Sequence, residues 1–488
     1  MRGGAAGLVG AAVSAASQFL IVVVVTRGSD AGTAGRFFTA TALCLMAAGV
    51  LRLDSGNGLI YFIARTRRSS DRDMSRYFQV ALVPVLVLSL GTAALAAGYA
   101  DVLAATLFSA PAASVPAGAV RVLAPALPWI VLADVLVAGT RGFGSMRPTA
   151  LLSGVLQPAG QLLLVAAVVL TGVAHRPLPP GADTGTALAV AWAAPALPVL
   201  LLTARWLRRR TPPRAERHVP RAATRAGGVP SERPATPTAD TAYPDRMAQE
   251  FSARKTAPNR SRAQLAREFW RYTGPRSVGG AAQAVFQRLD IVLVAMLSGP
   301  EQAALYAAAT RFKVAGQLVN QGFTQAVQPR LVRALAEGDL ALSRRLYQTT
   351  TMWLVLLTWP VWLGYALLAP WVLGVFGDGY SGGAAVAVVL AATMMLATAC
   401  GMADVVLIAA GRTAASMVNV LAAIGVTVAL DVVLVPRYGA LGAVLGWSGG
   451  MLVKNLLPLS LIHRRYGLRP FGAHSLPALR VWRPEETT

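Results

Sequence analysis

Charged residues are scarce in this sequence: they make up 14% of its 488 residues, while hydrophobic residues make up 55%. A water-soluble protein of this length could not cover its surface with so few charges, so the composition excludes an ordinary soluble fold. Cysteine is nearly absent as well, and the two cysteines, Cys44 and Cys400, both fall within apolar runs. This excludes a disulfide framework, and both residues are expected to fill small packing spaces.

Signatures of soluble chemistry are also missing. The four histidines, His175, His218, His463 and His474, are too scattered for a zinc site, and no metal is expected. No phosphate-binding glycine loop and no Gly-x-Ser-x-Gly motif occurs. These absences favour a protein that is not an enzyme and needs no cofactor. The remaining class is a transporter driven by its substrate gradient or by an ion gradient, with a proton and a sodium ion both left open.

Long apolar runs are what the sequence does contain. A helix needs roughly twenty apolar residues to cross a bilayer, and about twelve such runs recur along the chain. Helices are expected throughout, because the alternating pattern of a membrane barrel is missing. The first run is too long for a cleavable signal. The expected spans are 5–26, 34–63, 77–99, 118–140, 149–172, 186–207, 269–298, 302–328, 349–375, 384–409, 413–435 and 440–463.

Basic residues show which way these helices should cross the membrane. Arginine gathers in the breaks after even-numbered spans, above all at 64–76, 205–267 and 464–469. Because basic loops stay in the cytoplasm, the chain is expected to be a multi-pass protein of the plasma (inner) membrane with both termini cytoplasmic. The net charge of +23 is explained by this bias and by contact with anionic headgroups of the bilayer. No nucleic-acid partner is expected.

One break divides the chain. Residues 208–262 are rich in Pro, Arg, Ala and Thr and should form a disordered basic cytoplasmic linker, with a regulatory role left open. It separates an N-terminal six-helix lobe, 1–207, from a C-terminal six-helix lobe, 263–466. A cytoplasmic tail, 467–488, follows the second lobe. Residues 17–42 align without gaps over 286–311. The expected fold is an all-α polytopic membrane protein, with two lobes in a parallel repeat around a central cleft.

The eighth predicted helix carries a polar stripe. At about 100° per residue, one lysine and several amide and hydroxyl side chains fall on one face. Such a face cannot meet hydrocarbon, so it should line a cleft or contact other helices. Arg311 lies on the other side and is expected to form an ion pair or to anchor an interface. The stripe consists of Lys313, Gln317, Asn320, Gln321, Thr324 and Gln328.

The seventh predicted helix repeats this pattern. Arg276, Gln283, Gln287 and Asp290 share one face, and Arg288 lies beside them. Amides at such positions often hold helices together, whereas charges within a span usually line a pathway. We therefore interpret Asp290 as the first candidate for carrying a coupling ion, and two cations with the polar side chains of both helices as candidates for substrate binding. The substrate-binding candidates on these helices are Arg288, Lys313, Gln283, Gln287, Gln317, Asn320, Gln321 and Thr324.

Further charges fall within other predicted spans. Arg52 is added to the substrate-binding candidates, and Asp54, Asp134 and Asp404 are added to the ion-coupling candidates. Each carboxylate could equally cap a helix or pair with a base, and so could Asp431. The tripeptide Arg-Leu-Asp occurs at 52–54 and at 288–290, but these helices do not correspond in the repeat. The identity is therefore not used as evidence.

The sequence resembles a known family at two places. In the seventh and eighth helices, QRLDIVLVAMLSGPEQAALYAAATR is similar to the polysaccharide transporter branch of the superfamily of multidrug, oligosaccharidyl-lipid and polysaccharide exporters. O-antigen and exopolysaccharide flippases of this branch have an Asp, a Tyr and an Arg where Asp290, Tyr306 and Arg311 stand. The 419–447 segment resembles the family's penultimate hairpin, with Pro436 and a turn at Tyr438, Gly439 and Gly442.

The resemblance implies a flippase that passes a polyprenyl-pyrophosphate-linked oligosaccharide across the membrane by alternating access. Glycosyltransferases and a polymerase of the same pathway would be its partners. Arginine and lysine could neutralise the diphosphate, and the amides could bind sugar hydroxyls. A lipid II flippase and a multidrug or cation exporter of the same superfamily remain alternatives. A membrane glycosyltransferase or polymerase would need a larger external loop than this chain has, and a structural scaffold would leave the polar stripes unexplained.

Overall fold

The computed structural model describes residues 2–66, 71–108, 117–171, 183–210 and 261–475. Most of the predicted linker and residues 476–488 of the predicted tail lie outside this part, as do His175 and His218. Every regular element in the described ranges is a helix, so the expected all-α fold is confirmed.

The helices of the N-terminal half follow the predicted spans closely. The second, fifth and sixth spans are each made of two elements, namely α2 with α3, η2 with α7, and α8 with α9. The elements are α1 (Arg2–Gly28), α2 (Ala31–Leu51), α3 (Ser55–Thr66), α4 (Asp71–Gly98), α5 (Ala100–Phe108), α6 (Gly118–Gly142), the π-helical η2 (Thr149–Leu156), α7 (Gln157–Leu170), α8 (Thr184–Ala193) and α9 (Ala196–Arg210).

The C-terminal half contains more breaks. The seventh, eighth, ninth and tenth predicted spans are each made of two or more pieces. The elements are α11 (Arg262–Phe286), α12 (Leu289–Ser298), α13 (Pro300–Ala309), η4 (Thr310–Phe312), α14 (Lys313–Ala336), α15 (Leu340–Leu367), α16 (Ala369–Gly374), η5 (Asp378–Gly383), α17 (Ala384–Ala399), α18 (Ala403–Ala409) and α19 (Thr413–Tyr466).

Nine segments of the described ranges are long and apolar enough to cross a bilayer, and the bent pair of α11 and α12 makes a tenth. Two features explain the difference from the expected number. The 54-residue α19 contains both of the last two predicted spans, which fold back on each other at Gly439, where φ is 55°. The predicted span 302–328 is not among the ten. It is broken by η4, and α14 carries the polar stripe.

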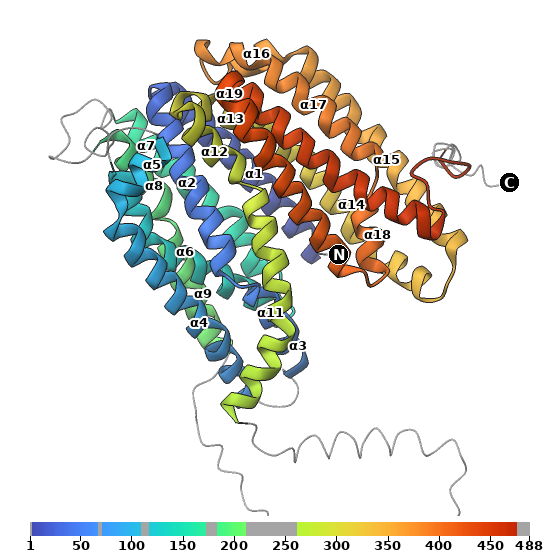
Figure 1. Cartoon of the computed structure of the whole chain (residues 1–488). Coiled ribbons are helices and arrows are strands. Elements are labelled where there is room, and N and C mark those ends of the chain that lie inside the picture. The colour runs from blue at the N-terminus through green and yellow to red at the C-terminus, as the bar shows by residue number, and fades with distance from the viewer. Residues whose placement is uncertain (1, 67–70, 109–116, 172–182, 211–260, 476–488) are drawn as a thin grey trace, which may run out of the picture.

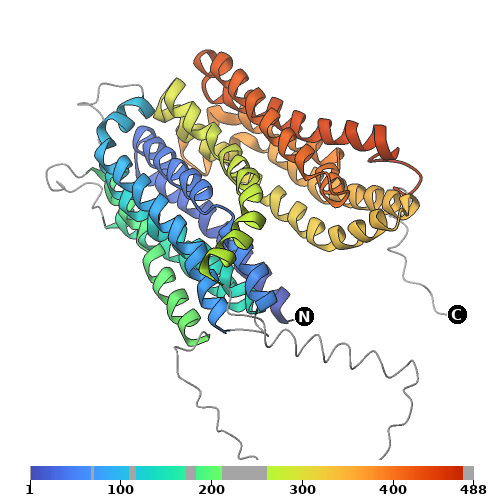
Figure 2. The same ribbon diagram turned by 60° about the horizontal axis from the view of Figure 1, so that its bottom comes forward.

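The helices form two groups that follow one another along the chain (Figure 1). Figure 2 shows the N-terminal group in blue and green and the C-terminal group in orange and red, with the yellow-green α11 between them. The two groups meet mainly where α2 packs along α12 and α13. Gly35 of α2 lies so close to Pro300 that a Cβ atom would collide with the Pro300 carbonyl group. Glycine at this position therefore permits the close approach of the two lobes.

Contacts between the lobes gather where α1 ends and α2 begins. The guanidinium of Arg27 donates hydrogen bonds to the carbonyl oxygens of Val375 (2.7 Å) and Gly374 (3.0 Å), at the end of α16. Phe19 of α1 packs against the rings of Phe312 and Phe376, with centroids 5.4 and 5.6 Å away. We call this region the contact end. The basic breaks follow the opposite ends of α3, α9 and α19.

Helix α11 belongs to neither group alone. It packs on α2, α3 and α4 of the N-terminal lobe and also touches α19. The ring of Tyr272 stacks on Tyr61 with centroids 4.6 Å apart, and Phe269 is fully buried beside Phe62. An ion pair of 3.0 Å joins Arg65 to Glu268. The first half of the seventh span is thus bound to the N-terminal lobe, although the sequence places it after the linker.

Candidate functional site

A buried ion pair forms the centre of the C-terminal lobe. Asp290, in the first turn of α12, is 1% exposed. It accepts hydrogen bonds from the Tyr306 hydroxyl (2.6 Å) and from the Lys313 ammonium (3.0 Å). The ammonium also lies over the ring of Trp447 in α19, 4.5 Å from its centroid. The Tyr306 hydroxyl and the Trp447 ring thus add favourable contacts to the buried ion pair, which offset part of the cost of removing its charges from water.

A break in the backbone places Asp290 there. The α11 helix ends at Phe286, and Arg288 (φ −133°, ψ −15°) precedes the first residue of α12. Asp290 therefore stands in a first helical turn, where free N–H groups and the helix dipole stabilise a carboxylate. The backbone N–H of Ile291 donates to its Oδ1 at 2.9 Å.

A second buried carboxylate lies in the same lobe. Asp431 of α19 is 0% exposed, and within the described residues neither of its oxygens has a hydrogen-bond partner. It faces Gly446 across the α19 hairpin, where a Cβ atom would strike its Oδ1. Its charge interacts with that of Asp290. An unpaired buried carboxylate is costly, so Asp431 is a functional candidate that sequence reasoning left out of its selection.

The sequence around Asp431 contains a signal of its buried position. Asn419, Thr427 and Asp431 fall near one face of α19, and all three are at most 4% exposed. A polar face of this kind within an apolar hairpin resembles the stripes used to select α11 and α14. From the sequence, Asp431 could equally carry an ion or have a structural role. Its neighbours across the hairpin cannot be predicted from the sequence.

Three cations of the interior have neutral partners or none. Arg311 donates to the backbone oxygen of Gln18 at 2.9 and 3.2 Å and to its side-chain oxygen at 3.3 Å. Lys454 donates to the side-chain oxygen of Gln283 at 3.1 Å. In the described ranges, no carboxylate oxygen lies within 4.0 Å of Arg288, Arg311 or Lys454. A contacting carboxylate therefore neutralises none of these three charges within the described ranges.

Arg311 was expected to form an ion pair or to anchor an interface, and in the structure it bonds to Gln18, which belongs to α1 of the other lobe. Gln18 in turn donates to the side-chain oxygen of Gln161 at 3.1 Å. Arg288 is close enough to Arg311 for the two like charges to repel one another. Arg288 and Arg311 thus form a positively charged site between the lobes, with no contacting carboxylate in the described ranges.

The predicted continuous polar face of the seventh helix is wrong. The axis bends by 44° between α11 and α12, so a single helical period does not run through the segment. Arg276 turns to the N-terminal lobe and pairs with Asp54 at 2.9 Å, while Gln283 meets Lys454 of α19. Gln287 is exposed beside the break, and Asp290 turns inward.

The polar stripe of α14 is only partly described. Asn320 is exposed, which fits a helix face that meets water. The hydroxyl of Thr324 lies 3.4 Å from the sulfur of Met402. The side chains of Gln317 and Gln321 lie outside the described part of the structure. Helix α14 itself packs on α15 and α18 of its own lobe.

The remaining candidates lie apart from Asp290. Arg52 is an exposed residue at the end of α2. Asp54 follows it in a left-handed conformation (φ 50°), accepts from Asn57 at 2.6 Å and pairs with Arg276. Asp54 thus joins the helix break to α11, which is a structural use of the carboxylate.

Asp134 and Asp404 each lie near a cation. Asp134 stands in α6, where its charge interacts with Arg52 and Arg141. Asp404 stands in α18, where its charge interacts with Lys454. The structure therefore distributes the four predicted ion-coupling carboxylates over both lobes, and it gathers only Asp290 with the unpredicted Asp431.

Comparison with known proteins relates the fold to transporters. No family model and no curated sequence matches the chain. Among solved structures, an inward-facing conformation of a multidrug resistance MATE family transporter of the MOP superfamily matches with a TM-score of 0.67 at 17% identity, over 94% of this chain and 98% of that one. The lipid II flippase MurJ in an inward closed conformation matches with a TM-score of 0.63 at 10% identity, over 95% of this chain and 89% of that one.

A third structure, a MOP superfamily transporter from Pyrococcus furiosus Vc1, matches with a TM-score of 0.56 at 16% identity, over 95% of this chain and 94% of that one. That protein is described by a binding pocket of reverse polarity, which suggests a different function for it. At these identities the likeness concerns the fold. This multi-pass membrane protein has the two-lobe fold of MOP superfamily transporters, among which both multidrug transporters and a lipid II flippase are found.

Proposed function

We propose that this protein is a flippase that moves a polyprenyl-pyrophosphate-linked oligosaccharide across the plasma membrane by alternating access. The observation that carries the proposal is the set of interior cations without a contacting carboxylate: Arg288, Arg311 and Lys454. A diphosphate is the kind of anion that guanidinium and ammonium groups bind strongly in a site with little water. Its lipid tail could remain in the bilayer while the headgroup passes between the lobes.

Pocket polarity also bears on the alternatives. Reverse polarity suggests a different function for the P. furiosus transporter, and here Arg288 and Arg311 have no carboxylate oxygen within 4.0 Å in the described ranges. A carrier of organic cations would need an excess of negative charge between the lobes. Asp431 is an observation that favours such a carrier, because its carboxylate is buried and has no hydrogen-bond partner among the described residues.

Lipid II contains the same diphosphate, so a lipid II flippase is the second candidate. The cations would serve either substrate equally, and the amides of α11 and α14 would meet different sugars. Exposed amides such as Asn320 and Gln287 favour sugar hydroxyls as a common feature of both headgroups. The two substrates are therefore distinguished by experiment rather than by charge.

The experiment uses purified protein in vesicles loaded with fluorescent lipid-linked substrates. A polyprenyl-pyrophosphoryl oligosaccharide and lipid II are offered separately, and the fraction accessible from outside is followed. Faster flipping of the oligosaccharide supports the proposal, while flipping of lipid II alone would make the protein a peptidoglycan precursor flippase. Flipping of neither, together with extrusion of an organic cation, would exclude the proposal.

A further inference from the structure

The chain folds back on itself after its last transmembrane helix. Helix α19 ends at Tyr466, and Gly467 takes the left-handed conformation (φ 62°) while donating its N–H to the carbonyl of His463 at 3.0 Å. This is a common helix ending that reverses the chain, and glycine tolerates it best. The next residue, Leu468, is fully buried in a small apolar cluster with Tyr347 and Ile462.

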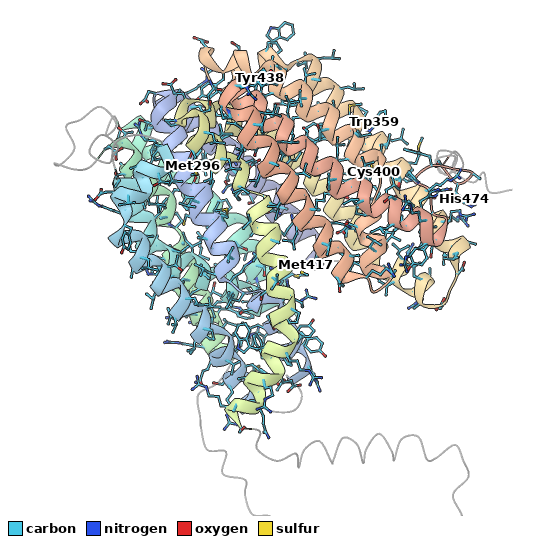
Figure 3. All side chains as sticks on the ribbon, in the orientation of Figure 1. Met296, Trp359, Cys400, Met417, Tyr438 and His474 are labelled. Carbon is cyan, nitrogen blue, oxygen red and sulfur yellow. The ribbon has the colours of Figure 1, made fainter. Side chains whose placement is uncertain are left out.

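One side chain of α15 holds the returning segment. The side-chain nitrogen of Gln348 donates to the carbonyl of Arg469 (3.4 Å), and its oxygen accepts from the backbone N–H of His474 (3.2 Å). The Gln348 side chain is 3% exposed. Figure 3 shows His474 at the far end of the C-terminal lobe. The segment from Gly467 to Ser475 is thus anchored at both sides of Phe471.

A pocket of about 580 Å³ opens between the last turns of α19 and this segment. Leu456, Leu459 and His463 line it from the helix, and Arg469 and Phe471 line it from the returning chain. Leu456 is 45% exposed and Phe471 is 43% exposed. The volume lies in the range of small-molecule sites, roughly 300–1,000 Å³. Its wall is mainly apolar and open on the outer surface of the molecule.

The charges at and next to the pocket have one sign. Arg469 lines it, and Arg464 and Arg465 follow the lining residue His463 in the chain. Arg464, Arg465 and Arg469 are all exposed, and none of them lies within 4.0 Å of a carboxylate oxygen in the described ranges. Two turns below them, Leu456 and Leu457 belong to the apolar stretch that crosses the membrane. The pocket therefore combines a basic rim with an apolar wall at the end of a membrane-spanning helix.

From this combination we propose that the pocket binds an anionic diacyl phospholipid of the leaflet that faces the basic breaks. Its phosphate lies between Arg469 and the arginines that end α19. An acyl chain lies along Leu456, Leu459 and Phe471. A soluble anion would not use the apolar wall, and a zwitterionic lipid would not need three unpaired guanidiniums. Lipid binding would hold the returning segment against α15 and α19.

Native mass spectrometry of the full-length protein in detergent tests this inference, with phosphatidylglycerol and phosphatidylcholine as the lipid probes. We expect retention of phosphatidylglycerol over phosphatidylcholine, and a loss of about tenfold or more in its affinity for Arg469→Gln, because a charge-assisted contact is removed. Phe471→Ser should weaken both lipids alike. The control is Arg437→Gln, an equally exposed arginine at the other end of the α19 hairpin, which should bind as the wild type does.

Several outcomes would overturn the inference. Equal binding of the two lipids would exclude recognition of the anionic headgroup. Unchanged binding in Arg469→Gln, or equal losses in Arg469→Gln and Arg437→Gln, would place the lipid elsewhere or make the attraction general. Complete displacement of phosphatidylglycerol by inorganic phosphate would make the site a simple anion site. None of these measurements depends on the transported substrate.

Discussion

The ammonium of Lys313 lies 3.0 Å from the Asp290 carboxylate, and both side chains are largely withdrawn from solvent. Sequence analysis selected both residues, the lysine for a diphosphate and the aspartate for a coupling ion. Because the two side chains contact each other, Lys313 can bind a diphosphate only if it releases Asp290, and Asp290 can bind a coupling ion only if it releases Lys313. Arg288 has no contacting carboxylate in the described ranges, so under the proposed function it is the cation that we expect to meet the diphosphate first.

The first prediction concerns the stability of this pair. Lys313→Met should leave a buried carboxylate without its counterion, which typically costs about 3–5 kcal/mol. Asp290→Asn should destabilise less, since the ammonium keeps the ring of Trp447. Thermal unfolding in detergent measures both, and the double variant should be more stable than Lys313→Met. If the double variant is no more stable than Lys313→Met, the two side chains are not coupled.

The second prediction concerns Arg288. Arg288→Ala should abolish flipping of the lipid-linked oligosaccharide while the amount of protein in the membrane stays unchanged, because no ion pair is broken in the fold. Arg288→Lys should retain part of the rate, since the charge remains. The matched control is Arg121→Ala, which removes an exposed arginine that pairs with Asp101. Normal flipping by Arg288→Ala would disprove the assignment of the anion site.

The third prediction concerns ion coupling. We expect flipping to respond to an imposed proton or sodium gradient, and Asp290→Asn and Asp431→Asn to lose that response. A carboxylate can bias the carrier only if its partner differs between the two orientations. Asp54→Asn is the control, because its carboxylate pairs with Arg276 outside this cluster. A full gradient response in both Asp290→Asn and Asp431→Asn would give the pair a structural role.

The fourth prediction concerns the contact end. Arg27 closes it with hydrogen bonds to two carbonyl oxygens at the end of α16. Arg27→Ala should favour the orientation that opens this end, by about tenfold if the bonds contribute their usual energy. A cysteine at Thr33, which is 6% exposed there, should then react faster with a membrane-impermeant maleimide. An unchanged labelling rate would show that Arg27 does not hold the lobes together.

The fifth prediction concerns orientation. A cysteine introduced at position 235 of the linker should resist labelling from outside intact cells, because the basic breaks are expected to be cytoplasmic. A cysteine at Gly379, in the exposed break between α16 and α17, should be labelled. Both native cysteines are buried, so the background is low. Labelling at 235 with protection at 379 would reverse the topology.

The sequence by itself determined the class of the protein and the polar nature of its interior. Hydropathy is a local property, and lipid demands that a spanning backbone satisfy its own hydrogen bonds, so apolar runs become helices whatever surrounds them. The polar stripe of α14 could be read for the same reason, since its position depends only on the helical period. Arg311 was expected to anchor an interface, and it contacts Gln18 of the other lobe.

Only the tertiary structure decided which charges meet. The helix breaks at Asp54 and Arg288 change the directions of the side chains around them. Both breaks lie within the two Arg-Leu-Asp tripeptides, which do not correspond in the repeat. Lys313 contacts Asp290, whereas Asp431 has no hydrogen-bond partner in the part of the chain that the structure describes. Both outcomes depend on the rotation and spacing of packed helices. Close approaches at Gly35 and Gly446 set that spacing. Such contacts join residues far apart in the chain, and no local pattern specifies them.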